Sequence, residues 1–222
     1  MSKIDLVKIS LQLESTDSRD RLLALVSLRD ASPSEAVPLI KKVLYDEILP
    51  VRSMAISALG IKATEESFPI LVKLLETDDD YGIRADAAGA LGYLRDTRAV
   101  EPLMRAYYED TEWLVRFSAA VSLGNLQDIR AKPVLLEALN NKDSVVRQAA
   151  IGALGEIKAV DVIDKLLSFV ASDDWLIRQR LAESLGKLKQ EKGLSALKFL
   201  AKDDHPQVRQ AAQLSLKEWE EA

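Results

Sequence analysis

The sequence predicts an all-α fold, an α-α superhelix or solenoid of about seven two-helix repeats of 31 or 32 residues. Three observations predict it. An arginine returns at this period along a single repeat domain, residues 1–222. In five copies a glycine follows the arginine by eight residues, within the same short phrase. In each copy the apolar residues recur at the spacing of one helix face. The arginines are Arg21, Arg52, Arg84, Arg116, Arg147, Arg178 and Arg209.

Each arginine marks the second helix of its repeat. The regular copies run from a Val-Arg or Ile-Arg pair to a Leu-Gly pair, at residues 51–60, 83–92, 115–124, 146–155 and 177–186. The copy at Arg21 is degenerate, and in the last copy Lys217 takes the place of the glycine. Acidic residues stand just before these helices, where a carboxylate can accept hydrogen bonds from the free N–H groups of the first turn.

The first helix of each repeat is predicted from a further apolar run, as at residues 38–44, 69–75 and 133–139. A proline inside a helix removes one backbone hydrogen bond and crowds the preceding turn. Because prolines recur near the start of four of these helices, we expect the helices to be kinked. The prolines are Pro38, Pro69, Pro102 and Pro133; the last two copies have Asp164 and Ser195 instead, and straighter helices are expected there.

Small and charged positions predict how the helix pairs stack. Alanine stands three residues after the arginine in four of the five regular copies, where a large side chain would hold neighbouring helices apart. The repeated glycine either lets the chain turn or gives a small surface for close packing. The arginine lies near the edge of the core, so we expect it to bond an acidic side chain or a loop carbonyl of its own or the next repeat. A row of arginines that binds anions is the alternative.

Composition narrows the classes of function. With 48% apolar and 5% aromatic residues, the chain can bury a core that is mainly aliphatic. It has no cysteine, which excludes disulfides, thiolate metal sites, cysteine nucleophiles and thioether-linked cofactors. The single histidine, His205, has no neighbour to orient it for acid–base chemistry, and we expect it at a solvated helix start. The acidic run 78–80 lacks a spaced set of oxygen ligands, so we expect helix capping and no metal site.

Charge and hydropathy bear on partners and location. The net charge is −5 and the basic residues are dispersed among acidic ones, which argues against nucleic acid as a partner. No segment reaches the roughly 18–20 uninterrupted apolar residues of a membrane span, and the N-terminus lacks a basic-plus-apolar signal pattern. We therefore expect a soluble, cytoplasmic protein without membrane insertion.

The repeat phrase resembles that of a known family. The pattern Asp-x-x-x-(Val/Ile)-Arg-x-x-Ala-x-x-(Ala/Ser)-Leu-Gly is similar to the HEAT-like repeat of the phycobilisome lyases, which attach or remove bilin pigments in cyanobacteria. Residues 80–94 and 113–126 resemble the lyase-related branch required for phycobilisome degradation in starved cells. The resemblance covers nearly the whole chain. It implies phycobiliprotein partners (phycocyanin or allophycocyanin subunits), other degradation factors, and transient contact with phycocyanobilin.

The resemblance also implies that the second helices line the concave side of the solenoid. Helical spacing places the positions one, two and five after each arginine opposite the buried face. At the fifth position Gly89 and Gly152 would let a flat ligand or a partner helix come near the backbone. Residues that break the repeat pattern surround this row. As candidate ligand- or partner-binding residues we take Tyr81, Asp86, Trp113, Phe117, Trp175 and Arg180.

Two interpretations of these residues stay open. A bilin offers flat rings, pyrrole N–H donors and two propionates, and these could meet an aromatic side chain, the carboxylate of Asp86 and the cation of Arg180. Asp86 is also the candidate catalytic residue, because a carboxylate adds nothing to the propensity of an alanine-rich helix. In the structural interpretation, the aromatic residues fasten helix starts to the previous repeat and the charges are solvated. We favour that interpretation for Trp175 and neither for Trp113 with Phe117.

The alternative function is that of a non-catalytic adaptor with a protein partner on its concave face. The sequence has no Ser-His-Asp, Cys-His or glycine-rich phosphate-loop constellation, so whether the protein is a lyase-like enzyme stays open. The histidine-dependent hydroxylase of the same repeat superfamily is excluded, since it needs repeated His-Glu pairs and this chain has one histidine.

Overall fold

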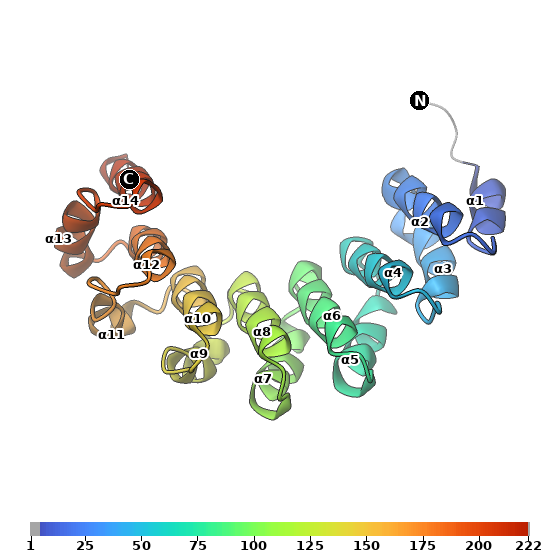
Figure 1. Cartoon of the computed structure of the whole chain (residues 1–222), viewed down its shortest axis with the longest axis horizontal. Helices are drawn as coiled ribbons and strands as arrows, with labels where there is room; N and C mark the ends of the chain where they lie inside the picture. Colours follow the sequence, from blue (N-terminus) through green and yellow to red (C-terminus); the bar gives the residue numbers. More distant parts are fainter. Residues whose placement is uncertain (1–4, 222) are drawn as a thin grey trace. The chain divides into compact units, whose positions relative to one another are not determined.

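The computed structural model describes residues 5–221. Within that range the chain is all helical, with fourteen α-helices, five short 3-10 segments and no strand (Figure 1). The predicted all-α solenoid class is confirmed. The chain divides into two compact units, Met1–Pro102 and Leu103–Ala222.

In the first unit the second helices of the repeats are α2, α4 and α6. They carry the first three arginines of the row, and α4 packs against both α2 and α6. Large aliphatic side chains of this unit, such as Ile56 on α4 and Leu71 on α5, are fully buried. The elements are α1 Leu6–Gln12, α2 Ser18–Ser27, η1 Leu28–Asp30, α3 Pro33–Ile40, η2 Lys41–Val43, α4 Leu49–Ile61, α5 Ser67–Thr77, α6 Tyr81–Leu94 and η3 Thr97–Ala99.

In the second unit the second helices are α8, α10, α12 and α14. Each packs against the next, and Figure 1 shows the first helices α9, α11 and α13 on one side of them. Helix α7, Val100–Glu109, begins in the first unit and ends in the second. The other elements are α8 Trp113–Asn125, η4 Ile129–Ala131, α9 Lys132–Ala138, α10 Ser144–Glu156, η5 Val160–Val162, α11 Ile163–Leu167, α12 Trp175–Leu188, α13 Glu191–Leu200 and α14 Pro206–Glu220.

Acidic side chains cap α6 and α12 as the sequence predicts, but the prediction is wrong for α8, α10 and α14, whose N-cap residues make no side-chain hydrogen bond to the first turn. The carboxylate of Asp80 accepts hydrogen bonds from the backbone N–H groups of Gly82 and Ile83, at 2.8 and 3.1 Å. Asp174 accepts from the N–H of Leu176 at 2.9 Å. These contacts satisfy donors that the helix itself cannot satisfy, and so they set where α6 and α12 begin.

The prediction that prolines kink the first helices is wrong for three of the four. Pro69, Pro102 and Pro133 lie within the first three positions of α5, α7 and α9, where an N–H group has no intrahelical acceptor to lose. Pro38 lies deeper, as the sixth residue of α3. A 3-10 turn precedes α7 and α9, but one also precedes α11, which has Asp164 in place of proline. The presence of proline therefore does not determine which of these helices begin after a 3-10 turn.

The repeated glycine allows close packing between second helices. A Cβ atom added to Gly60 would lie 2.8 Å from Cα of Ala90, and one added to Gly124 would lie 2.8 Å from Cα of Ala153. Among the described residues no glycine has a positive φ. The left-handed turns that follow four of the second helices fall on other residues, with φ between 48 and 53°: Arg95, Gln127, Lys158 and Lys189.

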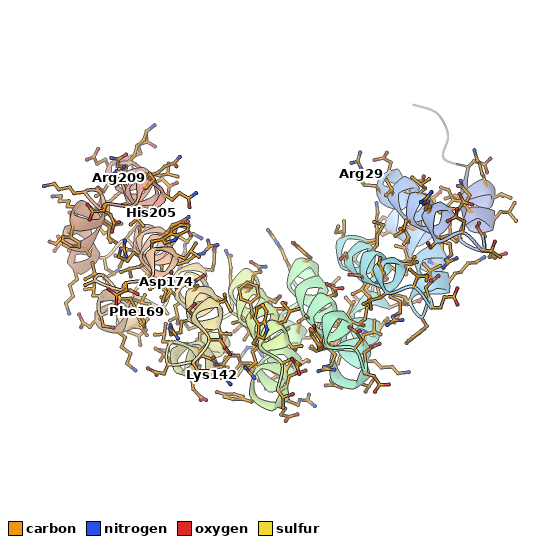
Figure 2. All side chains as sticks on the ribbon, in the orientation of Figure 1. Arg29, Lys142, Phe169, Asp174, His205 and Arg209 are labelled. Atoms are coloured by element: carbon orange, nitrogen blue, oxygen red, sulfur yellow. The ribbon has the colours of Figure 1, made fainter. Side chains whose placement is uncertain are left out.

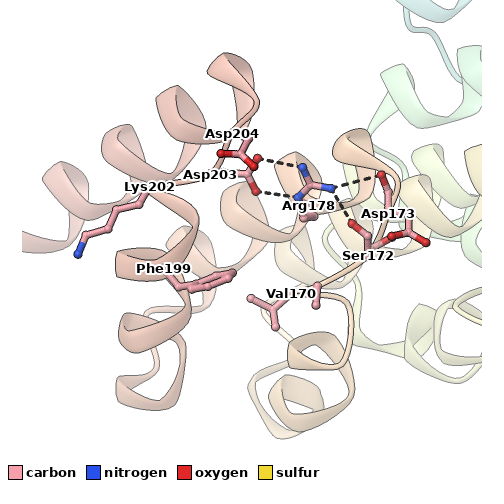
Figure 3. Close-up of a pocket in the computed structure, with 9 residues that line it drawn as sticks. Val170, Ser172, Asp173, Arg178, Phe199, Lys202, Asp203 and Asp204 are labelled. Carbon is pink, nitrogen blue, oxygen red and sulfur yellow. Dashed lines mark hydrogen bonds and ion pairs between the residues drawn. The ribbon is translucent and has the colours of Figure 1, made fainter.

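The arginine row fastens each second helix to the loop before it. Nη1 of Arg178 donates to the carbonyl oxygen of Ser172, six residues earlier, at 2.6 Å (Figure 3). The same bond to the carbonyl six residues back recurs at the other six arginines. Arg178 also reaches the next repeat, where its Nε and Nη2 donate to the carboxylate of Asp203 at 2.7 and 2.9 Å. The predicted structural role of the row is confirmed.

Candidate functional site

The second helices of the second unit form a groove. It lies along α8, α10 and α12 and has a volume of about 300 Å³. Most of the lining residues occupy equivalent positions of the repeat: they stand two, five or nine residues after the arginine of their helix. Phe117 and Gln148 add the position directly after the arginine. The residues at positions two, five and nine are Val121 and Asn125 on α8, Ala149, Gly152 and Glu156 on α10, and Arg180, Glu183 and Lys187 on α12.

Charged side chains in this groove are paired with one another. Nη1 of Arg180 donates to Glu183 at 2.8 Å, and the other carboxylate oxygen of Glu183 accepts from the amide of Gln179 at 2.9 Å. Lys187 on α12 forms an ion pair with Glu156 on α10. Both pairs are partly solvent-exposed, so an incoming charged group can exchange with either partner at small cost. The groove can therefore hold a ligand with an apolar surface and a charged end.

Two of the six candidate residues lie in this groove. Phe117 supplies an aromatic ring and Arg180 supplies a cation, both at its walls. The absence of a side chain at Gly152 leaves the middle open, since the nearest atom that a Cβ would meet is Cδ of Arg180 at 4.0 Å. Trp113, the first residue of α8, is 47% exposed and is not among the lining residues.

Trp175 makes a structural contact. Its ring stacks on the imidazole of His205, with centroids 3.9 Å apart and an interplanar angle of 16°. His205 is the N-cap residue of α14, the helix start predicted for it, and Figure 2 labels it beside that helix. The prediction that it is solvated is wrong, because the side chain is partly buried beneath this stack and its Nδ1 is buried. The stack joins the first turn of α12 to the start of α14. This contact supports a structural role for Trp175, but the predicted direction is wrong, because the ring joins α12 to the next repeat and not to the previous one.

Asp86 and Tyr81 lie on α6, in the first unit. The side chain of Asp86 is half-buried and accepts a hydrogen bond from the hydroxyl of Ser53 on α4. Burial raises the pKa of Asp86, the bond from Ser53 opposes that rise, and the nearby charge of Asp80 adds to it. Tyr81 is the exposed first residue of α6. Asp86 is thus a carboxyl that takes up a proton more readily than an ordinary aspartate.

Sequence reasoning missed some groove residues. The prediction used positions one, two and five after the arginine, and so passed over Glu156 and Lys187, which stand nine positions after it and directly follow the glycine. The signal was available, because nine continues the helical series two, five, nine. The residues at two predicted outward positions, Ala85 and Ala149, are instead buried, although Ala149 still lines the groove.

The described part of the chain, residues 5–221, shows no group of three or more His, Cys, Asp or Glu side chains that could hold a metal ion. Over the same residues no helix has both the length and the apolar character to cross a bilayer.

A family model for HEAT repeats matches residues 7–92, 74–155 and 133–217, and so covers most of the sequence. The chain belongs to the HEAT repeat family. This HEAT protein also resembles solved structures in fold, whereas among curated proteins none matches its sequence.

The first of these structures is the complex of CpcE and CpcF of phycocyanin lyase from Nostoc sp. PCC7120. A chain of that complex is 22% identical, with 100% of this chain and 89% of that chain covered and a TM-score of 0.66. Kap95p, from a structure with RanGDP, is 14% identical, with 100% of this chain and 36% of Kap95p covered and a TM-score of 0.64. An engineered protein is 21% identical, with 97% and 68% covered and a TM-score of 0.60. At these identities the likeness shows the fold alone.

Proposed function

We propose that this HEAT-repeat protein is related to the bilin lyases, binds phycobiliproteins, and helps to detach or handle their bilin chromophores. We further propose that it acts during phycobilisome degradation under nutrient starvation, as does NblB, which its strings at residues 80–94 and 113–126 resemble. The observation that carries the proposal is the groove along α8, α10 and α12, which combines an aromatic ring, an open backbone and exchangeable charges. The fold shared with a phycocyanin lyase chain supports it.

The groove's chemistry matches parts of a bilin. Phe117 offers a face for a pyrrole ring, and Gly152 leaves room for a flat group to approach α10. Arg180 can exchange its exposed bond to Glu183 for a bond to a propionate, which keeps the guanidinium paired throughout. A groove of about 300 Å³ lies at the lower end of ligand sites, so it would hold part of a chromophore that stays attached to its own protein.

Asp86, which lies on α6 in the first unit and not in this groove, is the proposed proton-handling residue. Since burial favours its neutral form, it can donate a hydrogen bond when protonated and accept one from a pyrrole N–H group when ionised. Its bond from Ser53 keeps the carboxyl oriented in either state.

A non-catalytic adaptor is the second candidate function. The observation that favours it is that Asp86 and Arg180 both have partners within the chain, Ser53 and Glu183. Groups held in this way suit a contact surface, and binding energy alone could then distort the pigment pocket of a partner.

Mixing the purified protein with phycocyanin, and separately with free phycocyanobilin, tests the proposal. Co-elution with phycocyanin together with a change in chromophore absorbance is the expected result, whereas no binding to either would end it. The Asp86→Asn variant separates the two functions. Unchanged chromophore detachment by this variant favours the adaptor, and lost detachment with retained binding favours a role for the carboxyl in chemistry.

A further inference from the structure

The first unit has a groove of a different kind, between α2 and α4. Its volume is about 230 Å³, and its lining is almost entirely apolar. Leu28 and Ile40 are fully buried at this groove, while Val26 and Ile61 on its walls are 55% and 68% exposed. Large apolar side chains left in water in this way mark a surface that gains free energy when it is covered.

The register of the repeats shows how distinct this groove is. Met54 and Ile61 stand two and nine positions after Arg52, the places that Arg180 and Lys187 occupy after Arg178. Equivalent positions of one repeat framework are thus apolar on α4 and cationic on α12. The two surfaces select different ligand chemistry.

The shape of the α4 wall suits a helix. Met54, Ser57, Ala58 and Ile61 line the groove at the spacing i, i+3, i+4 and i+7, which runs along one face for roughly 10 Å, or two turns. The small residues lie in the middle and the bulky ones at the ends. A ridge of side chains from an incoming helix fits such a depression.

The charges at this groove are positive. Arg29 and Lys62 are its charged lining residues, and the remaining lining residues are uncharged. Nζ of Lys62 is fixed, because it donates to the carbonyl oxygens of Arg29 and Ala31 at 2.5 and 2.6 Å. The guanidinium of Arg29 is exposed (Figure 2) and forms an ion pair with Asp30, whose Oδ1 lies 3.7 Å from its Nε. Because both side chains of this pair are exposed, a carboxylate of a partner can replace Asp30 at small cost. A carboxylate would therefore complement the charge at this end of the groove.

We propose that the α2–α4 groove docks an amphipathic helix of a partner protein. The helix carries apolar residues at i, i+3 or i+4, and i+7, and an acidic residue that meets Arg29 and Lys62. The apolar residues cover Val26, Met54 and Ile61, and the acidic residue fixes the direction of the helix.

A labelled helical peptide of about 14 residues tests the proposal. It carries leucines at i, i+4 and i+7 on a glutamate-rich background. Two further peptides serve for comparison: one with lysine in place of glutamate, and one with the leucines scrambled. Fluorescence anisotropy should show saturable binding of the acidic peptide, at least about tenfold weaker binding of the lysine peptide, and none of the scrambled one.

Variants assign the binding to the groove. Ile61→Glu should weaken the acidic peptide at least about tenfold, and Met54→Gln should weaken it less. Leu214→Glu, a change to another exposed apolar residue, should leave it unchanged. Circular dichroism confirms that each variant is folded. Equal binding by the wild-type protein and the Ile61→Glu variant, equal binding of all three peptides, or no saturable binding of the acidic peptide would overturn the proposal. A concentration-dependent dimer that Ile61→Glu abolishes would also overturn it, since the occupant would then be a second copy of this chain.

Discussion

Arg178 and Arg180 stand two residues apart on α12 and have opposite surroundings. Arg178 bonds the Ser172 carbonyl and pairs with Asp203, whose side chain is 7% exposed. Arg180 faces the open groove and pairs with Glu183 at its surface. The same residue type is therefore structural at position 178, whereas at position 180 it forms an exposed pair on the wall of the groove.

Arg178→Ala is expected to lower the free energy of unfolding by about 3–5 kcal/mol, because it leaves the Asp203 carboxylate buried without its partner. Arg180→Ala should cost less than about 1 kcal/mol, since its ion pair is exposed. Urea denaturation at neutral pH measures both. Equal losses would contradict the division of roles.

The pH dependence of the free energy of unfolding gives a second check on Arg178. Arg178 holds the pKa of Asp203 below its usual range. The contribution of the pair is therefore present above the pKa of the unfolded carboxyl, about 4, and is lost as pH falls through the lower folded value. The loss in the free energy of unfolding caused by Arg178→Ala should therefore become smaller in strong acid.

Asp86 behaves in the opposite sense. Its pKa is raised in the folded state by burial, so its contribution to stability falls as pH rises from the unfolded pKa, about 4, through the folded one. Asp86→Asn should unfold at a higher temperature than the wild-type protein at neutral pH, and the advantage should vanish below about pH 4. Thermal unfolding across this pH range measures the difference. The Ser53→Ala variant removes the hydrogen bond that opposes the rise in the pKa of Asp86, so it should lower the stability at neutral pH further. A wild-type protein that is the more stable at neutral pH would contradict this assignment.

At the scale of the element, α10 holds two glycines with different tasks. A Cβ on Gly155 would lie 2.6 Å from Oγ and 2.8 Å from Cα of Ser184, so this residue lets α12 approach. Gly152 faces the groove, where a Cβ has room. The close approach of the helices comes from one position of the repeat and the open groove from the other.

Gly155→Ala is expected to destabilise the protein by about 1–3 kcal/mol through overpacking. Gly152→Ala, three residues away on the same helix, should stabilise it by about 0.5–1 kcal/mol, because alanine is the better helix former. Chemical denaturation of the pair measures both signs. A loss at both positions would show that the groove is closed at Gly152.

The helices and their stacking could be predicted from the sequence, because the arginine and glycine hold a fixed spacing and the apolar positions repeat. The starts of the first helices could not, since 3-10 turns precede α11 without a proline and α7 and α9 with one. The left-handed turns could not be predicted from the sequence either, because residues with no preference for a positive φ, such as Gln127 and Lys158, adopt them. The geometry of the turn, not the preference of the residue, selects that conformation.

The site was predictable in part for the same reason. Phe117 and Arg180 stood out because they break the repeat pattern, and both line the groove. Lys187 did not stand out, since the residue after the glycine varies in every copy. The contact of Trp175 with His205 depends on two residues 30 positions apart, which no local pattern links.

At the scale of the whole molecule, the framework repeats and the surfaces differ. The α2–α4 groove is apolar with a cationic end, and the groove along α8, α10 and α12 is mixed in polarity. Each lies on the second helices of its own unit. The arginine row serves the stack in every copy, so we expect binding to depend on the positions at which the copies differ.

The most direct test of this account is the affinity for phycocyanin of a variant with a filled groove. Gly152→Phe places a ring in the middle of the groove along α8, α10 and α12, whereas Lys165→Phe places the same ring on the exposed surface of α11. Isothermal titration calorimetry should show binding by the wild-type protein and by Lys165→Phe, and at least about tenfold weaker binding by Gly152→Phe. Equal affinity of all three proteins would contradict the account.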